Sequence, residues 1–196
     1  TTDDMKAKVG FRVGFGTEYA FNDMWSLQPS LFFSTKGTKA DSGDAMEAKA
    51  EVTVNQMYLE LPVMAAARFN VADNANLVVS AGPYFAYGIG GKTKTTVKMM
   101  GQEAKVKFNT FGDIDKVTLE YDGESKDLSI GELGDFADED LSDATGLNRF
   151  DFGLGVGVAL EFNRFIVGLD GQFGLTKLQT DGGKNMNFAI SVGYKF

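Results

Sequence analysis

The chain has 196 residues, which suits a single domain, and its 27 acidic and 19 basic side chains give a net charge of −8. It contains no cysteine and no histidine, so disulfides, thiol chemistry, the usual catalytic triads and the commonest metal ligand are excluded. It also lacks any run of apolar residues long enough for a transmembrane helix. The 17 Phe and 24 Gly, with only 3 Pro, are typical of aromatic strands joined by tight turns.

Four strands are predicted in the first half of the chain, because apolar residues recur at every second position. They follow a polar loop at residues 1–8 and cover Val9–Phe21, Trp25–Lys36, Gln56–Phe69 and Leu77–Ile89. Residues 37–51 have mixed charges and two glycines, so they are predicted to form a loop. Residues 70–76 are predicted to form a turn.

Residues 91–148 form an insertion between the fourth and fifth strands. They carry 7 Lys and 13 Asp or Glu, so the insertion holds −6 of the total charge of −8. Three of its segments resemble strands, with a turn at Gly101-Gln102 between the first two: Thr95–Met100, Glu103–Phe111 and Lys116–Asp122. A short helix, with Ser129 as its cap, is predicted within Leu128–Leu141. We interpret 91–148 as a partly ordered extracellular hairpin where a protein or glycan partner would bind, since a structureless loop of this length would be unusual.

The alternation is clearest near the C-terminus, in the segments Phe150–Phe162, Phe165–Thr176 and Asn187–Phe196. One face of each segment is large and apolar, while the other holds Gly, Ala, Ser and charged residues. A Gly-rich face suits a narrow interior, so the large apolar face must look out at something other than water. Lipid-facing and lumen-facing residues alternate in this way in outer-membrane barrels.

The predicted fold is therefore all-β, a small antiparallel transmembrane β-barrel of about eight strands. Seven strands can be read in this chain. The predicted location is the outer membrane of a Gram-negative bacterium, with outer-membrane lipid around the barrel.

Aromatic residues cluster around the predicted short turns, where Phe-Asn pairs close three of the strands. We predict that they form an aromatic girdle on one rim, at the periplasmic lipid interface: Phe21, Trp25, Phe69, Phe162, Phe165 and Phe196. The alternative is that these hairpin aromatics pack in an ordinary core.

Charged residues recur on the inward face of the predicted strands. The predicted interior network contains Arg12, Glu18, Lys36, Glu60, Arg68, Asp151, Glu161, Asp170 and Lys195. Buried charges persist when they are paired, so we favour a salt-bridged plug over an acid/base pair.

Other apparent motifs do not indicate chemistry. The acidic residues between Asp135 and Asp143 lack the ligand spacing and central glycine of a calcium-binding EF-hand loop. The glycines between Gly153 and Gly157 alternate with apolar residues, as in a strand and not in a phosphate-binding loop. No catalytic, cofactor-binding or metal-binding residue is predicted, and no nucleic-acid partner.

Several segments resemble the PorT-like, porin-family outer-membrane β-barrel proteins of Bacteroidetes. They are Trp25–Gly37, Tyr58–Val63, Ala81–Tyr87, Phe150–Gly155 and Ser191–Phe196. The resemblance covers the strands, about half the chain, and not the 91–148 insertion. It implies a small barrel, typically eight-stranded and without a defined activity, whose C-terminal aromatic strand is read by the barrel-assembly machinery.

The strand count leads to an expectation about the N-terminus. If Phe196 lies on the periplasmic side, seven strands place Thr1 outside the cell, whereas bacterial single-chain barrels have an even number of strands. We therefore expect a signal peptide and one further strand to precede Thr1 in the full-length protein. The edge of Val9–Phe21 that faces the last strand would then be unpaired in this chain.

The sequence predicts a non-enzymatic outer-membrane barrel with a structural or binding role through its long acidic loop. A soluble lipocalin-like carrier of an apolar ligand is the alternative from another class, and it requires the Phe and Leu face to turn inward. A narrow porin and an accessory subunit of an outer-membrane complex are further alternatives. An open pore is disfavoured because about eight strands leave an interior just wide enough for side chains.

Overall fold

The computed structural model describes residues 4–45, 48–99, 102–112, 114, 116–121, 123–129, 132, 146–177 and 184–196. These residues form a β-sheet of thirteen strands whose described neighbours all pair antiparallel. The predicted all-β fold is confirmed, whereas the predicted count of about eight strands is wrong. Nowhere in the described chain does a helix have the length and apolar character needed to cross a membrane.

The chain folds into two compact units. Unit 1 contains Thr1–Phe11, Ser34–Tyr58 and Gly88–Arg149, and unit 2 contains Arg12–Phe33, Leu59–Tyr87 and Phe150–Phe196. Three long strands supply residues to both units: β4 (Trp25–Ala45), β5 (Ala48–Ala72) and β6 (Ala75–Gly90).

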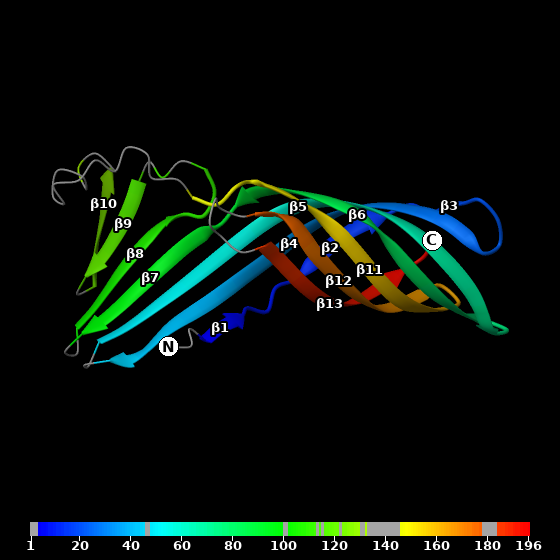
Figure 1. Cartoon of the computed structure of the whole chain (residues 1–196), viewed down its shortest axis with the longest axis horizontal. Coiled ribbons are helices and arrows are strands. Elements are labelled where there is room, and N and C mark those ends of the chain that lie inside the picture. Colours follow the sequence, from blue (N-terminus) through cyan, green and yellow to red (C-terminus); the bar gives the residue numbers. More distant parts are fainter. Residues whose placement is uncertain are drawn as a thin grey trace. The chain divides into compact units, whose positions relative to one another are not determined.

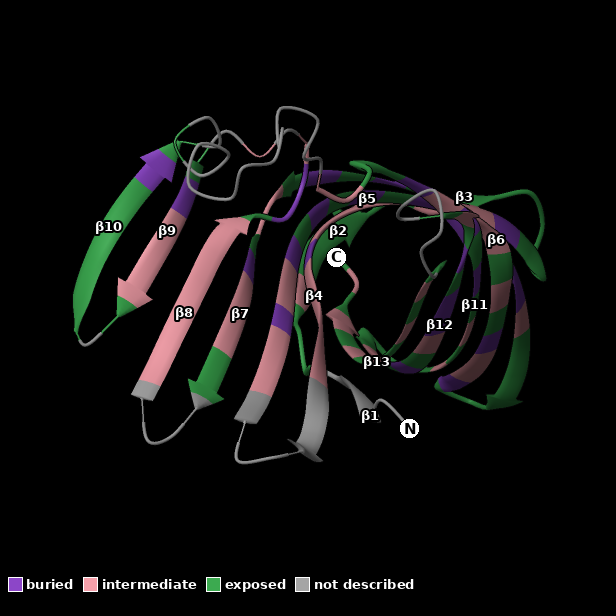
Figure 2. Cartoon of the chain, turned by 60° about the vertical axis from the view of Figure 1, so that its left-hand side comes forward, coloured by how far each residue is buried: buried purple, intermediate pink, exposed green. Residues whose placement is uncertain are grey.

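Unit 2 also contains β2 (Arg12–Gly16), β3 (Tyr19–Ala20), β11 (Phe150–Phe162), β12 (Phe165–Lys177) and β13 (Lys184–Tyr194). β2 and β3 pair with β4, and the order continues through β5, β6, β11 and β12 to β13. These strands curve around an interior (Figure 2). Within the described residues no pairing joins β13 to β2. The strand expected before Thr1 stays a prediction.

Alternating exposure in unit 2 confirms that the large apolar side chains point outward. Leu154 is 50% exposed and Val156 is 48% exposed, while Gly153 and Gly155 are buried. β13 alternates between exposed and half-buried residues along its whole length (Figure 2). The lipocalin-like alternative needed this apolar face inside, so its premise is removed.

The buried glycines of β11 let large groups approach the strand closely. A Cβ atom at Gly153 would lie 2.2 Å from the carbonyl oxygen of Phe173 and 2.6 Å from a ring carbon of Tyr84. Any larger side chain would therefore force the backbone of β12 or the ring of Tyr84 to shift. This close packing explains a glycine at that position.

Two predicted loops in the N-terminal half are in fact strands. β4 continues to Ala45 and β5 already begins at Ala48, so most of the predicted loop at 37–51 is a hairpin of two long strands. β1 (Asp4–Ala7), inside the predicted loop at 1–8, pairs with residues 38–41 of β4. Backbone hydrogen bonds to neighbouring strands hold these polar segments extended, although their side chains show no apolar alternation. The predicted strand Val9–Phe21 is divided into β2 and β3.

Unit 1 contains a meander of β7 (Lys92–Met99), β8 (Gln102–Asn109), β9 (Lys116–Tyr121) and β10 (Glu124–Ser129) (Figure 1). β7 pairs with residues 48–54 of β5. The three strands predicted in the insertion are confirmed, while β10 was missed because its sequence is charged and short. A turn was predicted at Gly101-Gln102. Gln102 instead begins β8, and Gly101 lies outside the described residues.

A reciprocal pair of hydrogen bonds follows β10. The N–H of Glu132 donates to Oγ of Ser129 at 3.3 Å, and the N–H of Ser129 donates to Oε2 of Glu132 at 2.8 Å. This is the capping box of a helix N-terminus, so Ser129 occupies the predicted cap position. The rest of the predicted helix and the acidic residues from Asp135 to Asp143 lie outside the described residues.

Candidate functional site in the interior of unit 2

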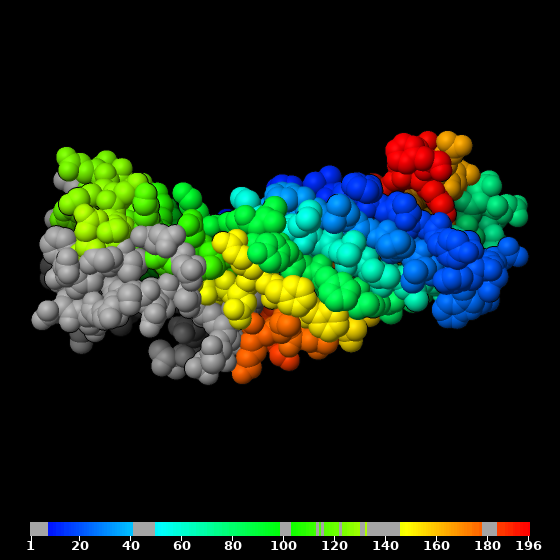
Figure 3. Space-filling view, turned by 90° about the horizontal axis from the view of Figure 1, so that it is seen from above, coloured from blue at the N-terminus to red at the C-terminus, as the bar shows by residue number. Residues whose placement is uncertain are grey.

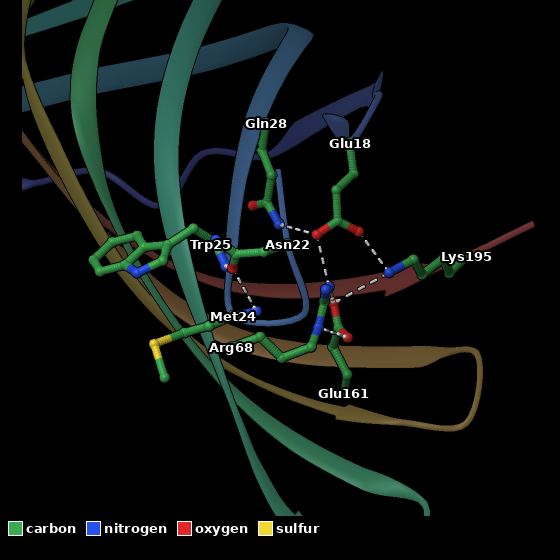
Figure 4. Close-up of polar contacts among 8 residues, drawn as sticks. All are labelled: Glu18, Asn22, Met24, Trp25, Gln28, Arg68, Glu161 and Lys195. Carbon is green, nitrogen blue, oxygen red and sulfur yellow. Dashed lines mark hydrogen bonds and ion pairs between the residues drawn. The ribbon is translucent and has the colours of Figure 1, made fainter. Parts of the chain in front are cut away.

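Arg68 of β5 lies at the centre of a charged cluster in unit 2 (Figure 4). Its Nε and Nη2 donate to the two carboxylate oxygens of Glu161, each at 3.0 Å, and Nη2 also donates to Oε1 of Glu18 at 2.7 Å. Nζ of Lys195 lies 2.6 Å from Oε2 of Glu18 and 3.8 Å from Oε1 of Glu161. Gln28 donates to Glu18 at 3.3 Å. We call Glu18, Arg68, Glu161 and Lys195 the charge cluster.

The strand period places these charges inside. Glu161 is only 7% exposed, although its neighbours Leu160 and Phe162 are 47% and 55% exposed. Arg68 likewise precedes the exposed Phe69. Neighbouring side chains of a strand point to opposite faces. Because the apolar neighbours point outward, as they do towards lipid in outer-membrane barrels, Glu161 and Arg68 point to the interior. There each charge needs a partner, because a buried unpaired charge is costly.

A second polar group lies on β12. Asp170 forms an ion pair with Arg12, with 3.2 Å between Nη2 and Oδ2, and the Arg12 guanidinium lies 4.5 Å from the centre of the Phe32 ring. Two residues further along β12, Gln172 donates to the fully buried Glu60 at 3.2 Å. Of these residues, Arg12 interacts both with the carboxylate of Asp170 and with the face of the Phe32 ring.

The third polar group surrounds Asp151, which is fully buried. Its carboxylate accepts hydrogen bonds from the Tyr84 hydroxyl at 3.1 Å, the Thr176 hydroxyl at 2.8 Å and the Asn185 amide at 2.8 Å. These neutral donors lie outside the predicted charge network. The alternation along β12 puts Thr176 on the same inward face as Asp170, and the alternation along β6 puts Tyr84 inward as well.

Lys36 is not among the charges brought together in unit 2. It lies in unit 1, where its Nζ is 5.2 Å from the centre of the Tyr58 ring. The other predicted interior charges take part in contacts around Arg68, on β12 and around Asp151. That they form a salt-bridged plug stays a prediction.

The predicted girdle residues lie at one end of unit 2. Backbone hydrogen bonds join the turns there, from Asn163 to Asn74 at 3.0 Å, from Lys195 to Arg164 at 2.8 Å and from Arg68 to Met24 at 2.7 Å. The C-terminal residues and the β11–β12 turn protrude side by side (red and orange in Figure 3). The six aromatics are all exposed, namely Phe21, Trp25, Phe69, Phe162, Phe165 and Phe196.

One detail of the turn prediction is wrong. Phe69-Asn70 does not close its strand, because β5 continues to Ala72 and the turn follows at residues 73–74. Asn163 has the expected turn conformation, with a φ of 54°. That the aromatic end marks a lipid interface stays a prediction.

Charge pairing and hydrogen bonding account for the described carboxylates of the interior. Within the described residues no group of three or more Asp or Glu side chains could hold a metal ion. The carboxylates of the charge cluster are paired with Arg68 and Lys195, and Asp151 accepts three hydrogen bonds. The ion pairs connect β5, β11, the segment between β2 and β3, and the residue that follows β13.

Comparison with known proteins fits this arrangement. No curated protein and no solved structure matches the chain. A family model described as outer membrane protein beta-barrel domain matches residues 1–179. Together with the outward apolar face and the polar interior, this match places the protein in the outer membrane of a Gram-negative bacterium. The chain belongs to the outer membrane protein beta-barrel domain family.

Proposed function

We propose that the protein is a non-enzymatic, non-conducting barrel that presents residues 91–148 outside the cell for binding. The observation that carries this proposal is the charge cluster, in which Arg68 bridges Glu18 and Glu161. It links β5, β11 and the segment between β2 and β3 across the interior. A structural role of this kind needs no reacting group in the lumen.

The geometry supports a closed interior. The side chains of Arg68, Glu18 and Glu161 are 18%, 18% and 9% exposed. Short ion pairs of this kind hold long side chains in place inside the curved sheet. The contacts of Asp170 and Gln172 on β12, and the hydrogen bonds around Asp151, place further side chains inside unit 2, where they would block the passage of ions.

The insertion offers the binding surface. Its lysines concentrate in the strands, since β7, β8 and β9 contain six of the seven, whereas Glu103 and Glu120 are the only acidic residues in these three strands. The remaining acidic residues lie in β10 and in the connecting segments. A partner protein or glycan would therefore meet a basic sheet beside acidic connections.

The resemblance to PorT-like barrels of Bacteroidetes supports assembly through the C-terminal strand. β13 and the residues after it carry a row of exposed aromatic and apolar side chains that ends in Tyr194 and Phe196. We propose that the barrel-assembly machinery reads this segment. The exposed strand pattern supports that role.

Planar-bilayer recording of the purified protein tests the closed interior. The unmodified protein should show no stable open channel, while removing the bridge by Arg68→Ala together with Glu161→Ala should produce measurable openings. Thr118→Ala, in β9 of the insertion, serves as the control and should stay silent. A steady, ion-selective current from the unmodified protein would overturn the proposal in favour of a narrow porin.

A further inference from the structure

Unit 1 contains an open-sided cavity of about 610 Å³ that the proposed function does not use. Its charged lining residues are Lys8, Lys36, Lys92 and Arg149, and no Asp or Glu lines it in the described part of the chain. The whole chain has a net charge of −8. A lining whose charged residues are all cationic, in an acidic protein, favours an anionic ligand. We call this site the cationic cavity.

Asn55 of β5 positions two of the lysines. The Lys8 ammonium donates to Oδ1 of Asn55, and the backbone N–H of Lys8 donates to the carbonyl of Gly37 at 2.9 Å. The Asn55 amide donates to the backbone carbonyl of Lys92 at 3.2 Å. Lys92 is opposite Asn109 in the β7–β8 ladder, and both residues line the cavity. Two exposed lysine residues are thereby joined to the same strand, Lys8 through its ammonium group and Lys92 through its backbone.

The other cations are held by backbone and aromatic contacts. Nη1 of Arg149 donates to the carbonyl of Gly88 at 3.1 Å, and Nη2 donates to that of Phe111 at 3.5 Å. A guanidinium has five N–H donors, so further donors are available to a ligand. Lys36 lies over the ring of Tyr58. These contacts hold the Arg149 guanidinium and the Lys36 ammonium in place.

Apolar side chains form the other part of the lining. Val9, Met57 and Ile89 line the cavity and are 96%, 42% and 50% exposed. In an outer-membrane protein such side chains meet acyl chains, and neighbouring lysines extend towards the headgroup layer. Gly91, with a φ of 147°, also lines the cavity, and its missing side chain lets the backbone of Asn55 approach, since a Cβ there would lie 2.2 Å from the Asn55 carbonyl oxygen.

We infer that the cationic cavity binds the phosphate-bearing headgroup of a membrane lipid. Lys8 and Lys92 contact the phosphate, while Val9, Met57 and Ile89 contact the adjoining part of the acyl chains. Basic pockets of membrane proteins recognise anionic headgroups through such charge-assisted hydrogen bonds. A free phosphate ion would use the cations and leave the apolar lining unoccupied, so the combined lining favours the lipid.

The test measures lipid selectivity in the intact chain. The protein is reconstituted in phosphatidylcholine membranes containing spin-labelled phosphatidic acid or spin-labelled phosphatidylcholine, and the motionally restricted fraction of each probe is compared. The unmodified protein should prefer phosphatidic acid. Lys8→Gln combined with Lys92→Gln should weaken this preference about tenfold, because two charged hydrogen-bond donors are removed. Lys116→Gln, on β9 and outside the cavity lining, is the matched control.

Each other result overturns the inference. Equal loss of preference in the Lys116→Gln control would show general surface attraction, and no preference in the unmodified protein would show that the cavity selects no phosphate lipid. Displacement of the phosphatidic acid probe by equimolar inorganic phosphate would identify a free-anion site. Circular dichroism and heat-modifiability on gels confirm that the variants remain folded.

Discussion

Arg68 of β5 and Glu161 of β11 face each other through two parallel hydrogen bonds, each 3.0 Å long. This fork geometry uses both carboxylate oxygens and fixes the distance between two strands that are 93 residues apart in the sequence. Nη2 of the same guanidinium also reaches Glu18. Of the two cations in the charge cluster, Arg68 lies on a described strand, β5, whereas Lys195 follows the end of β13.

Replacing Arg68 with Ala should destabilise the barrel by about 3–5 kcal/mol, because the buried Glu161 loses both of its guanidinium hydrogen bonds and Glu18 loses one of its two cations. Lys195→Ala should cost no more than about 1 kcal/mol, since the Lys195 side chain is 43% exposed and solvent screens its charge. Reversible urea unfolding from lipid vesicles measures both. Equal costs for the two variants would contradict the central role of Arg68.

The lipid face gives a second prediction. Leu154→Arg should destabilise the barrel by about 2–4 kcal/mol if position 154 lies near the bilayer midplane. Gly155→Ser should cost much less, because the nearest atom to a Cβ there is the flexible end of Met64, at 3.2 Å, and the Gly82 carbonyl oxygen lies at an ordinary contact distance of 3.7 Å. The same unfolding assay applies. Similar losses for Leu154→Arg and Gly155→Ser would contradict the outward assignment of Leu154.

Glycines on the same face are not equivalent, so a third substitution tests the packing. At Gly153 a Cβ would lie 2.2 Å from the carbonyl oxygen of Phe173, which is backbone and cannot move aside cheaply. Gly153→Ser should therefore cost about 1–3 kcal/mol more than Gly155→Ser. Equal stability of the two serine variants would mean that β11 and β12 can separate at this point.

The sequence predicted the strands of unit 2 well because each has lipid on one side and a narrow lumen on the other. That environment imposes a strict period of two, and β11 begins and ends at the predicted Phe150 and Phe162. The period also identified Glu161 and Arg68 as inward charges. Their pairing with Glu18 depends on which strands become neighbours, which the period does not determine.

The polar ends of β4 and β5 could not be predicted in this way. Residues 38–45 and 48–51 show no alternation of large apolar and polar residues in the sequence, and their extended form depends on backbone pairing, which β1 and β7 provide for part of them. The hydrogen-bond donors around Asp151 also come from three strands. Each donor looks ordinary in its own segment, and only the fold brings Tyr84, Thr176 and Asn185 to one carboxylate.

The chain has a single tryptophan, Trp25, which begins β4 and is 50% exposed. If the aromatic end of unit 2 lies at a membrane interface, bromine atoms near the lipid headgroup should quench Trp25 fluorescence more than bromines near the acyl-chain end. A tryptophan introduced by Leu154→Trp in a Trp25→Phe background should show the reverse order. Stronger quenching of Trp25 by deep bromines would contradict the girdle.

The β7–β8 hairpin carries a carboxylate held between two lysines. Glu103 accepts a hydrogen bond from Lys105 at 2.6 Å and one from Lys98 at 3.0 Å. The hydrogen bond from Lys105, followed by that from Lys98, lowers the pKa of Glu103 from 4.5 to about 2. The pKa of Lys105 is raised by the same contact.

This pKa shift predicts how acid affects the hairpin. Because the pKa of Glu103 is lower in the folded state, its stabilising contribution is present above pH 4.5 and is lost as the pH falls towards about 2. Amide hydrogen exchange of β7 and β8 should therefore accelerate over that window, beyond the intrinsic change with pH, while a carbon-13 titration follows the carboxyl group. Glu103→Gln should remove the extra acceleration. Glu124→Gln is the control, since no ion pair of Glu124 occurs in the described structure. An unchanged acid response in Glu103→Gln would assign the effect to other groups.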